Sequence, residues 1–433
     1  MDILIIYERI NREYENALLL QRYLRLNGHR CEITQYYDAD NFFPSSDQVP
    51  DIIFVPSLYN TQAVERVVAR FGNPSRIINL QYEQVLSEKW EKLGHHNPKG
   101  LAIQYEHVCW GERTKQRLLN VGIKEENLHL IGALQLDLLH ERFLSPVKVR
   151  NTLSTEYEIS TDHRWKLFLS SFTYANISDE RLRMNESVAG VSLASFRDIH
   201  TQSRDRLVDW FEYVLEMDKE SIFIYRPHPD ELNLDPVKEL ESRYPHFKII
   251  RENSAKVWIE ASDSIFSWYS TTVVESHYMN KPYAILRPSP LPDDFDSVLL
   301  KKGSFITSRD DFVDYYINNS QAKALNDSDV KDYYINDFSK LVVEELVGIV
   351  NSSRASSKLS FSFRQLFLHR VKSLVVKLIF ISVVNKNTVL SRCLLKSAFI
   401  TSWKKEIEAQ QPSDKEKRLM INNIEMRLSI NAD

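Results

Sequence analysis

The sequence predicts an α/β protein in which two Rossmann-like domains face a cleft and are followed by a basic helical tail. Short apolar runs alternate with amphipathic stretches from Ile3 to Leu286, a polar segment interrupts them near residue 150, and no acidic residue occurs between Glu345 and Glu406. Alternating strands and helices are typical of a parallel sheet with helices on both faces. A chain of 433 residues is long enough for two such domains and an appendage.

The first domain is predicted over residues 1–150. Its strand-like runs are ILIIY, CEIT, DIIFV, RIINL, YEHVCW and LHLIG. The helix-like stretches between them are NREYENALLLQRYLRLNGH, TQAVERVVARFG, EQVLSEKWEKLG and GERTKQRLLNVG. Ligands of such open sheets bind beyond the carboxyl ends of the strands.

The second domain is predicted over residues 151–350, after a polar and aperiodic segment from Leu144 to Asp162 that we interpret as a linker or a peripheral excursion. Its strand-like runs are KLFLS, SIFIY, FKII, SIFSW and YAIL. Its helix-like stretches are SRDRLVDWFEYVLEM, PVKELESRY, AKVWIEAS and TVVESHYM. Two such domains in series describe the GT-B architecture, although the pattern also fits other enzymes with paired α/β domains.

Residues 351–433 are predicted to form a basic amphipathic tail. The basic residues between the two flanking acids are Arg354, Lys358, Arg364, Arg370, Lys372, Lys377, Lys386, Arg392, Lys396, Lys404 and Lys405. The apolar residues at helical spacing are Phe361, Phe363, Leu366, Phe367, Val371, Leu374, Val375 and Leu378. Such a helix is typical of an interfacial membrane element, in which each cation contributes about 1 kcal/mol near an anionic surface. We therefore expect residues 354–405 to bind an anionic membrane; a helix packed on the second domain is the alternative.

Composition excludes several classes of function. A net charge of −4 argues against a nucleic-acid partner, and Cys31, Cys109 and Cys393 have no zinc-site or disulfide spacing. The start of the chain lacks a secretory signal pattern, and the late apolar run SLVVKLIFISVV falls short of the roughly 20 residues of a spanning helix. We expect a cytoplasmic protein without a spanning segment.

No cofactor or metal is expected. The chain has only 10 glycines, with neither the G-x-G-x-x-G nor the P-loop spacing, and it has no D-x-D or His/carboxylate spacing that suggests a metal. A nucleotide would therefore have to be bound by residues outside these motifs.

The stretch IYRPHPDE is the first candidate for a nucleotide-binding segment. It follows the strand-like run SIFIY, and its two prolines hold Arg226 and His228 in extended geometry, so little entropy is lost when a ligand binds. Arg offers a planar fork for a phosphate, and His can donate to a phosphate or protonate a leaving oxygen. The alternative is a surface loop in which Arg226 pairs with Asp230 or Glu231.

Two hydroxyl-rich segments follow other strands. Ser270, Thr271 and Thr272 precede a predicted helix that carries Glu275, and hydroxyls with N–H groups at a helix start form an anion site. The alternative is a capping box formed by Thr272 and Glu275. The second segment, LSSFTYAN, could contact a phosphate or an acceptor hydroxyl, or it could be a polar linker; its candidate residues are Ser170, Ser171, Thr173 and Asn176.

Two carboxylates in the first domain are candidates for the catalytic base or nucleophile. Glu8 follows ILIIY and Glu83 follows RIINLQY, so both lie near predicted strand ends. The alternative for each is a carboxylate that stabilises a helix N-terminus.

Taken together, these motifs resemble those of a known superfamily. IYRPHPDE looks like the H-P motif, and SWYSTTVVES like the Ser/Thr motif, of GT-B enzymes with cytidine nucleotide donors, which include sialyl-, Kdo- and glycerophosphate transferases. The stretches VCWGERTKQRLLNVG, LHLIGALQLD and LSSFTYAN resemble bacterial surface carbohydrate (capsule or O-antigen) biosynthesis proteins. The resemblance spans about residues 1–286.

The resemblance implies a metal-independent glycosyltransferase that uses a CMP-linked donor, such as Kdo or another acidic sugar, and a glycan or glycolipid acceptor. The first domain would then be the acceptor side and the second the donor side. Arg226 and His228 would meet the donor phosphate with help from Ser270 and Thr271, and Glu275 would reach the ribose. The acidic motif of sialyltransferases is reduced here to Glu83. The tail would dock at the inner face of the cytoplasmic membrane. A sugar-nucleotide epimerase of related fold and a non-catalytic scaffold of polysaccharide assembly are the competing hypotheses.

Overall fold

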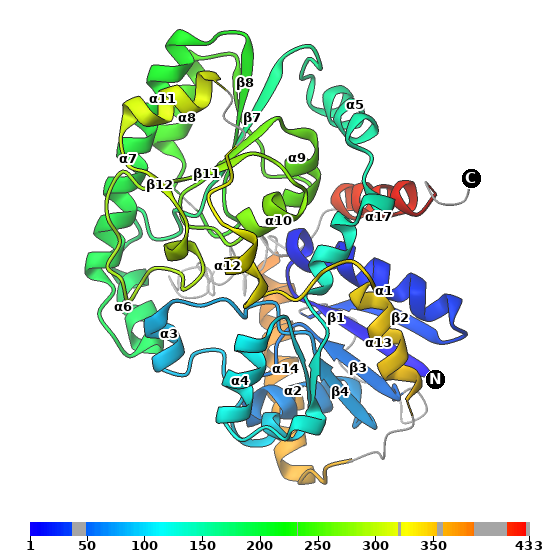
Figure 1. Ribbon diagram of the computed structural model, residues 1–433. Helices are drawn as coiled ribbons and strands as arrows, with labels where there is room; N and C mark the ends of the chain where they lie inside the picture. The colour runs from blue at the N-terminus through cyan, green and yellow to red at the C-terminus, as the bar shows by residue number, and fades with distance from the viewer. Residues whose placement is uncertain (37–48, 232, 319–321, 353–357, 385–413, 430–433) are drawn as a thin grey trace. The chain divides into compact units, whose positions relative to one another are not determined.

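The computed structural model describes residues 1–36, 49–231, 233–318, 322–352, 358–384 and 414–429 (Figure 1). The chain divides into two compact units, and each is an α/β unit with its own sheet. Unit 1 consists of Met1–Gln84, His96–Asp137 and Asp332–Met426, and unit 2 of Val85–His95, Leu138–Lys331 and Arg427–Asp433. The chain passes to unit 2 at Leu138 and returns to unit 1 at Asp332, whereas the sequence analysis placed these boundaries at residues 150 and 350.

In the described part of unit 1, six strands form a parallel sheet in the order β2-β1-β3-β4-β5-β6. The strands are β1 (Asp2–Tyr7), β2 (Arg30–Gln35), β3 (Ile52–Val55), β4 (Arg76–Asn79), β5 (Glu106–Cys109) and β6 (Leu128–Leu130). The helices are η1 (Ile10–Tyr14), α1 (Glu15–Leu26), α2 (Thr61–Phe71), η4 (Gly100–Gln104), α4 (Glu112–Asn120), η5 (Glu125–Asn127), α13 (Val342–Asn351) and α14 (Phe363–Val384). The chain also contains η6 (Leu134–Leu139) and α17 (Asp414–Ser429).

Both faces of the unit 1 sheet are covered. Helix α1 packs with α13 on one face, and α2 packs with α14 on the other (Figure 1). The central strands β3 and β4 are buried at every position, which is why they read as continuous apolar runs in the sequence.

The return of the chain to unit 1 has a specific physical basis. The Asp137 carboxylate accepts hydrogen bonds from the N–H groups of Val342 (3.0 Å) and Val343 (2.7 Å), at the start of α13. Gly111 lets the backbone of Tyr333 approach so closely that an added Cβ would lie 2.4 Å from its carbonyl carbon. Trp110 stacks on Tyr334 with ring centroids 5.4 Å apart. These contacts hold the returning segment on unit 1.

The described part of unit 2 contains a second six-stranded parallel sheet, in the order β12-β11-β10-β7-β8-β9. The strands are β7 (Arg164–Leu169), β8 (Ser221–Arg226), β9 (Phe247–Ile249), β10 (Ser264–Ser267), β11 (Tyr283–Leu286) and β12 (Phe305–Ile306). The helices are α3 (Glu88–Lys92), η7 (Glu141–Phe143), α5 (Pro146–Tyr157), α6 (Asp179–Ala189), α7 (Ala194–Met217), α8 (Asp235–Arg243), α9 (Ala255–Ala261), α10 (Val273–Tyr278), η8 (Leu300–Lys302), α11 (Arg309–Asn318) and α12 (Asp327–Lys331).

Helices α7, α8 and α11 cover one face of the unit 2 sheet, and α5, α9 and α10 cover the other (Figure 1). The core between the sheet and α7 is rich in aromatic side chains, with Phe168, Phe211 and Phe223 fully buried. The predicted α/β architecture of both halves is confirmed.

Two local predictions are wrong. The segment from Leu144 to Asp162 is mainly the helix α5, which begins with Pro146 at its first turn and buries only Val149 and Leu153 against the unit. Two apolar contacts in twelve residues are too few to give a periodic signal. The helix expected over EQVLSEKWEKLG is shorter in the structure and comprises only α3. Its N-cap is Ser87, whose side chain accepts a hydrogen bond from the N–H of Trp90.

The tail prediction is only partly covered by the structure. Helix α14 packs on α2 of unit 1. The residues 354, 386, 392, 396, 404 and 405, and Cys393, lie outside the described residues, as do the side chains of Lys377 and Leu378. Of the helices that can be searched, none has the length and apolar character needed to cross a membrane.

Candidate functional site

The three predicted ligand loops of unit 2 meet at one side of its sheet, where the carboxyl ends of the strands lie; we call this the carboxyl edge. They follow β7, β8 and β10, and β7 lies between the other two strands. The N–H of Ser170 donates to the carbonyl of Arg226 (2.9 Å), and the N–H of Tyr269 donates to the Ser171 hydroxyl (3.2 Å). The loop after β7 therefore joins the loops after β8 and β10.

Arg226 ends β8 and is 7% exposed. Its guanidinium donates to the carbonyls of Glu252 (2.8 Å) and Asn253. These carbonyls lie in the turn after β9. Arg226 thus ties the loop after β8 to its neighbour and brings a positive charge to this edge.

Glu231 is the buried centre of the same edge. Its carboxylate accepts hydrogen bonds from the hydroxyls of Ser170 (2.6 Å) and Tyr225 (2.7 Å), and from the N–H of His228 at 3.3 Å. Burial raises the pKa of Glu231, and the hydrogen bonds from Ser170 and Tyr225 oppose that rise. The carboxylate therefore fixes the loop that carries His228, a function that the sequence did not reveal.

His228 is the most accessible of these groups, with 35% of its side chain exposed. The N–H of Asp230 donates to its Nδ1 at 3.1 Å, so a neutral ring carries its proton on Nε2. The carboxylate of Asp230 lies 3.8 Å from Nδ1. His228 is thus held as an Nε2–H donor.

The loop after β10 presents hydroxyls rather than a helix terminus. The Ser270 hydroxyl donates to Thr272 Oγ1 (2.8 Å), and Thr272 makes no side-chain cap on α10, so the predicted capping box does not form. The N–H groups of Val273, Val274 and Glu275 already bond the carbonyls three residues earlier, which leaves the helix start unsuited to the predicted anion site. Ser270, Thr271 and Glu275 are partly buried.

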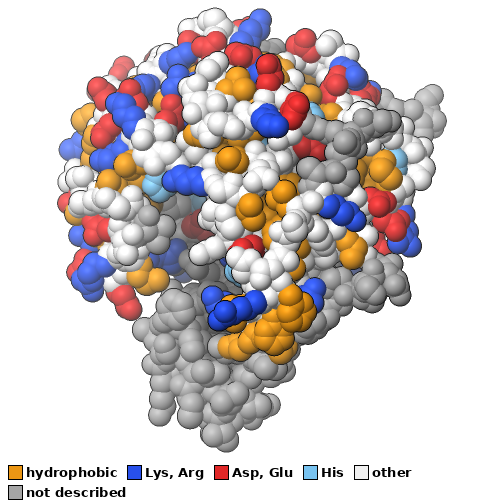
Figure 2. All heavy atoms as spheres, turned by 90° about the horizontal axis from the view of Figure 1, so that it is seen from below, with side chains coloured by type: hydrophobic (Ala, Val, Ile, Leu, Met, Phe, Trp, Pro, Cys, Tyr) orange, Lys and Arg blue, Asp and Glu red, His pale blue; other side chains and the backbone are white. Residues whose placement is uncertain are grey.

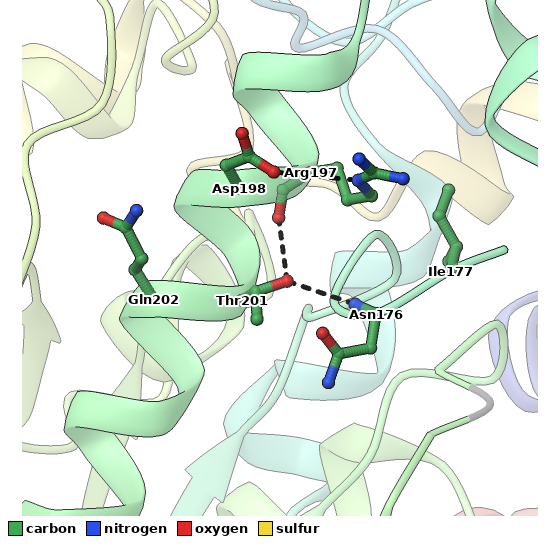
Figure 3. A pocket seen from close by; sticks show the side chains of 6 residues that line it. All are labelled: Asn176, Ile177, Arg197, Asp198, Thr201 and Gln202. Carbon is green, nitrogen blue, oxygen red and sulfur yellow. Dashed lines mark hydrogen bonds and ion pairs between the residues drawn. The ribbon is translucent and has the colours of Figure 1, made fainter. Parts of the chain in front are cut away.

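The loop after β7 divides into two parts. Ser170 and Ser171 are buried and hold the neighbouring loops, whereas Thr173 is partly buried and Asn176 is exposed. Asn176 has a positive φ of 53°, and its N–H donates to the Thr201 hydroxyl (3.1 Å) at the side of a surface pocket of about 440 Å³ (Figure 3). The pocket is polar and is lined by Asn176, Ile177, Arg197, Asp198, Thr201 and Gln202.

In unit 1, Glu8 and Glu83 belong to one cluster at the carboxyl edge of the sheet. The buried Glu13 carboxylate accepts from the N–H of Glu8 (2.6 Å) and from Arg12 Nε (2.9 Å). Arg12 Nη1 in turn donates to Glu83 at 2.9 Å. His96 Nδ1 lies 3.1 Å from the other Glu83 oxygen. Sequence reasoning found the two outer carboxylates and missed the Arg12 and Glu13 pair that links them.

The two carboxylates differ in their electrostatics. Burial raises the pKa of Glu8, and the nearby Glu13 carboxylate adds to the rise. Burial would raise the pKa of Glu83 as well, but Arg12 and then His96 outweigh it, so the pKa is lowered. Glu8 therefore has the higher proton affinity, which suits a general base, whereas Glu83 is stabilised as an anion.

The donor sets do not suggest a metal centre. Among the described residues no group of three or more His, Cys, Asp or Glu side chains is arranged to hold a metal ion. Cys31 and Cys109 are buried free thiols in unit 1. Burial raises the pKa of both thiols to about 12, which makes them inert as nucleophiles.

Comparison with known proteins supports the fold. No protein-family model and no curated protein matches the sequence. Among solved structures, the wall teichoic acid polymerase TagF matches with a TM-score of 0.54 and 11% identity, over 81% of this chain and 88% of that chain. The chain has a GT-B-like two-domain α/β fold.

Epimerase structures share this GT-B-like fold. UDP-GlcNAc 2-epimerase from Neisseria meningitidis, bound to UDP-GlcNAc, matches with a TM-score of 0.50 and 13% identity, over 80% of this chain and 100% of that chain. The S. aureus MnaA structure with UDP matches with a TM-score of 0.51 and 12% identity, over 81% and 96% of the two chains. At such identities the likeness establishes the architecture and leaves the reaction to be argued from the side chains.

Proposed function

We propose that this protein is a glycosyltransferase that takes a sugar from a nucleotide donor and adds it to a bacterial surface polysaccharide or a lipid-linked acceptor. The observation that supports it best is the convergence of the loops after β7, β8 and β10 at the carboxyl edge of the unit 2 sheet, where α/β folds bind nucleotides. The specific donor we propose is CMP-linked Kdo or another acidic sugar, on the strength of the two sequence motifs.

The proposed reaction breaks the bond between the anomeric carbon of the sugar and a donor phosphate oxygen, and it forms a bond from that carbon to the oxygen of an acceptor hydroxyl. Negative charge then develops on the leaving phosphate. Donation by the Nε2–H of His228 and by the Thr271 hydroxyl would stabilise that charge, and Ser270, whose hydroxyl donates to Thr272 Oγ1, would position the loop. Arg226, whose guanidinium bonds the turn after β9, supports this arrangement as a positioning residue and a nearby positive charge. Glu275 is proposed to bind a ribose hydroxyl.

The acceptor hydroxyl must lose a proton, and we assign the base to unit 1. Glu8 is favoured over Glu83 because its raised pKa gives it the greater proton affinity. Glu83, paired with Arg12, would keep the local charge fixed as Glu8 takes up a proton. No metal enters this proposal, since hydrogen-bond donors neutralise the phosphate.

A thermal-shift comparison tests the donor site. CMP, CDP, UMP and UDP are added to the wild type, to His228→Ala and to His163→Ala, a control histidine at the amino end of β7. We expect a pyrimidine nucleotide to raise the melting temperature of the wild type and of the control, and not that of His228→Ala. If none of the four nucleotides stabilises the wild type, the donor site is not where we place it.

An epimerase is the second candidate. One matching structure is a UDP-GlcNAc 2-epimerase and another is a complex with UDP, and the match with this chain extends over 100% and 96% of those chains. Incubation with UDP-GlcNAc and, separately, with the nucleotide sugar that corresponds to the nucleotide found by thermal shift tells the two reactions apart. An epimerase produces a second sugar nucleotide without an acceptor, whereas a transferase releases free nucleotide that increases when an acceptor is added. The scaffold hypothesis gains if Arg226→Ala and His228→Ala leave glycan synthesis unchanged in cells.

A further inference from the structure

The described side chains of helix α14 define two faces, one packed on α2 and one exposed to solvent. Leu366 joins the buried cluster that contains Val64, Val67 and Val68 of α2. On the same side, His369 Nε2 lies 2.9 Å from the Glu65 carboxylate, and Arg370 Nε donates to the carbonyl of Ala69 at 3.0 Å. An apolar helix face is stable when it is buried against other apolar side chains. Among the described residues, the cluster on α2 buries one face of α14 in this way.

The opposite face of α14 exposes large apolar side chains. Their exposed fractions are Phe363 79%, Phe367 53%, Leu368 50%, Val371 39%, Leu374 36% and Val375 48%. At 3.6 residues per turn these six positions cover an arc of about 140° that does not include the face packed on α2. We call this arc the α14 apolar face.

Cations border the α14 apolar face, and acids are missing from it. Arg364 falls within its arc and Lys372 lies at its edge, and both are exposed, as is Lys358 just before the helix. No Asp or Glu occurs in the sequence between Glu345 and Glu406. Figure 2 shows hydrophobic side chains gathered next to Lys and Arg side chains on the face seen from below.

We propose that the α14 apolar face docks on an anionic lipid bilayer, with the helix lying in the plane of the interface. Phenylalanine, leucine and valine side chains would enter the boundary between headgroups and acyl chains, and Arg364 and Lys372 would reach anionic headgroups along their flexible stems. The combination of apolar area and unopposed positive charge complements an anionic lipid surface, whereas a purely apolar partner would leave the cations uncompensated. This surface also gives the predicted location at the inner face of the cytoplasmic membrane a defined contact. The proposal does not depend on the proposed reaction.

Sedimentation with vesicles tests the proposal on the full chain. Phosphatidylcholine vesicles with about 30% phosphatidylglycerol are compared with pure phosphatidylcholine vesicles. The apolar variant is Phe367→Glu with Val371→Glu, the charge variant is Arg364→Gln with Lys372→Gln, and the control is Val147→Glu, an apolar residue of α5 that is 75% exposed. All substituted side chains point to solvent, so the melting temperatures should stay near that of the wild type. Point variants are preferable to removal of the tail, because removal would uncover the α2 cluster.

We expect the wild type and the control to sediment with the anionic vesicles and much less with the neutral ones. The apolar variant should lose binding by at least about tenfold, and the charge variant should bind the two vesicle types equally weakly. Failure of the wild type to sediment overturns the proposal, as does sedimentation that the apolar variant retains. If the wild type fails to bind vesicles but is a dimer that the apolar variant converts to a monomer, a second copy of the chain covers this face instead.

Discussion

The carboxyl edges of the two sheets use charge in different ways. In unit 1 the Arg12 guanidinium pairs with both Glu13 and Glu83, and Glu8 lies beside them with a raised pKa. In unit 2 the buried Glu231 carboxylate is held by neutral hydroxyls, and the cation Arg226 is held by backbone carbonyls. The first arrangement favours proton transfer, and the second favours a rigid frame for His228. Similar parallel sheets thus surround their charged side chains in two different ways.

Replacement of the base should produce the largest effect. Glu8→Gln removes the proton acceptor and preserves its size, so turnover of the donor identified by thermal shift should fall by about 10²–10⁴-fold. In the wild type, kcat/KM should decline at acidic pH, at a pKa above the usual value of 4.5, because burial raises the pKa of Glu8. Steady-state rates and melting temperatures of Glu8→Gln and Glu83→Gln provide the measurement. A larger loss of kcat in Glu83→Gln at unchanged stability would reverse the assignment.

Acid should weaken unit 1 before unit 2. Burial opposes ionisation of Glu106, but its hydrogen bonds to Arg76 and His129 lower its pKa to about 2 from 4.5. Its ion pair therefore stabilises the fold fully above about pH 4.5, and about 3 kcal/mol is lost as the pH falls toward 2. Glu231 has a raised pKa, so its contribution has the opposite sign: it is present at low pH and lost as the pH rises through the folded-state pKa.

Hydrogen exchange followed by mass spectrometry measures this difference, with intrinsic rates corrected between about pH 6 and pH 3. Peptides from β4 and β5 should lose protection on acidification more than peptides from β7 and β8. Arg76→Gln should remove most of the acid sensitivity of unit 1 by lowering its protection at pH 6. Equal acid sensitivity of both units would show that the two networks are electrostatically alike.

Removal of the Glu231 carboxylate should have the next largest effect. Glu231→Ala removes the shared acceptor of the buried hydroxyls of Ser170 and Tyr225, which can then bond only one another, and the free energy of unfolding should fall by about 2–3 kcal/mol. Glu231→Gln retains one carbonyl oxygen and should cost about 1 kcal/mol. Denaturant unfolding of both variants, with nucleotide binding measured in parallel, tests whether the hydrogen bonds of Glu231 hold the loop that carries His228. If Glu231→Ala keeps full nucleotide affinity, the Glu231 carboxylate is not needed to position His228.

The sequence predicted the parallel strands well because buried strands such as ILIIY and SIFIY are continuous apolar runs. It also placed His228, Ser270 and Glu83 near strand ends, since a strand end is a local feature. It could not predict the return to unit 1, which depends on Asp137 bonding residues more than two hundred positions later. For the same reason Ser170 was predicted to meet a ligand, although its hydroxyl is bonded to Glu231, 61 residues away.

The smallest predicted effect comes from removal of the Tyr225 hydroxyl, which bonds both Glu231 and the Ser170 hydroxyl. Tyr225→Phe fills the same space and removes the hydroxyl that donates to Glu231 at 2.7 Å, while Ser170 and the N–H of His228 still bond the carboxylate. Stability should fall by about 1 kcal/mol, and nucleotide affinity should weaken less than in Glu231→Ala, because two of the three bonds remain. Tyr213→Phe, at an exposed position of α7, is the matched control and should leave both quantities unchanged. If Tyr225→Phe weakens nucleotide binding as much as Glu231→Ala does, the tyrosine hydroxyl acts on the ligand rather than through the carboxylate.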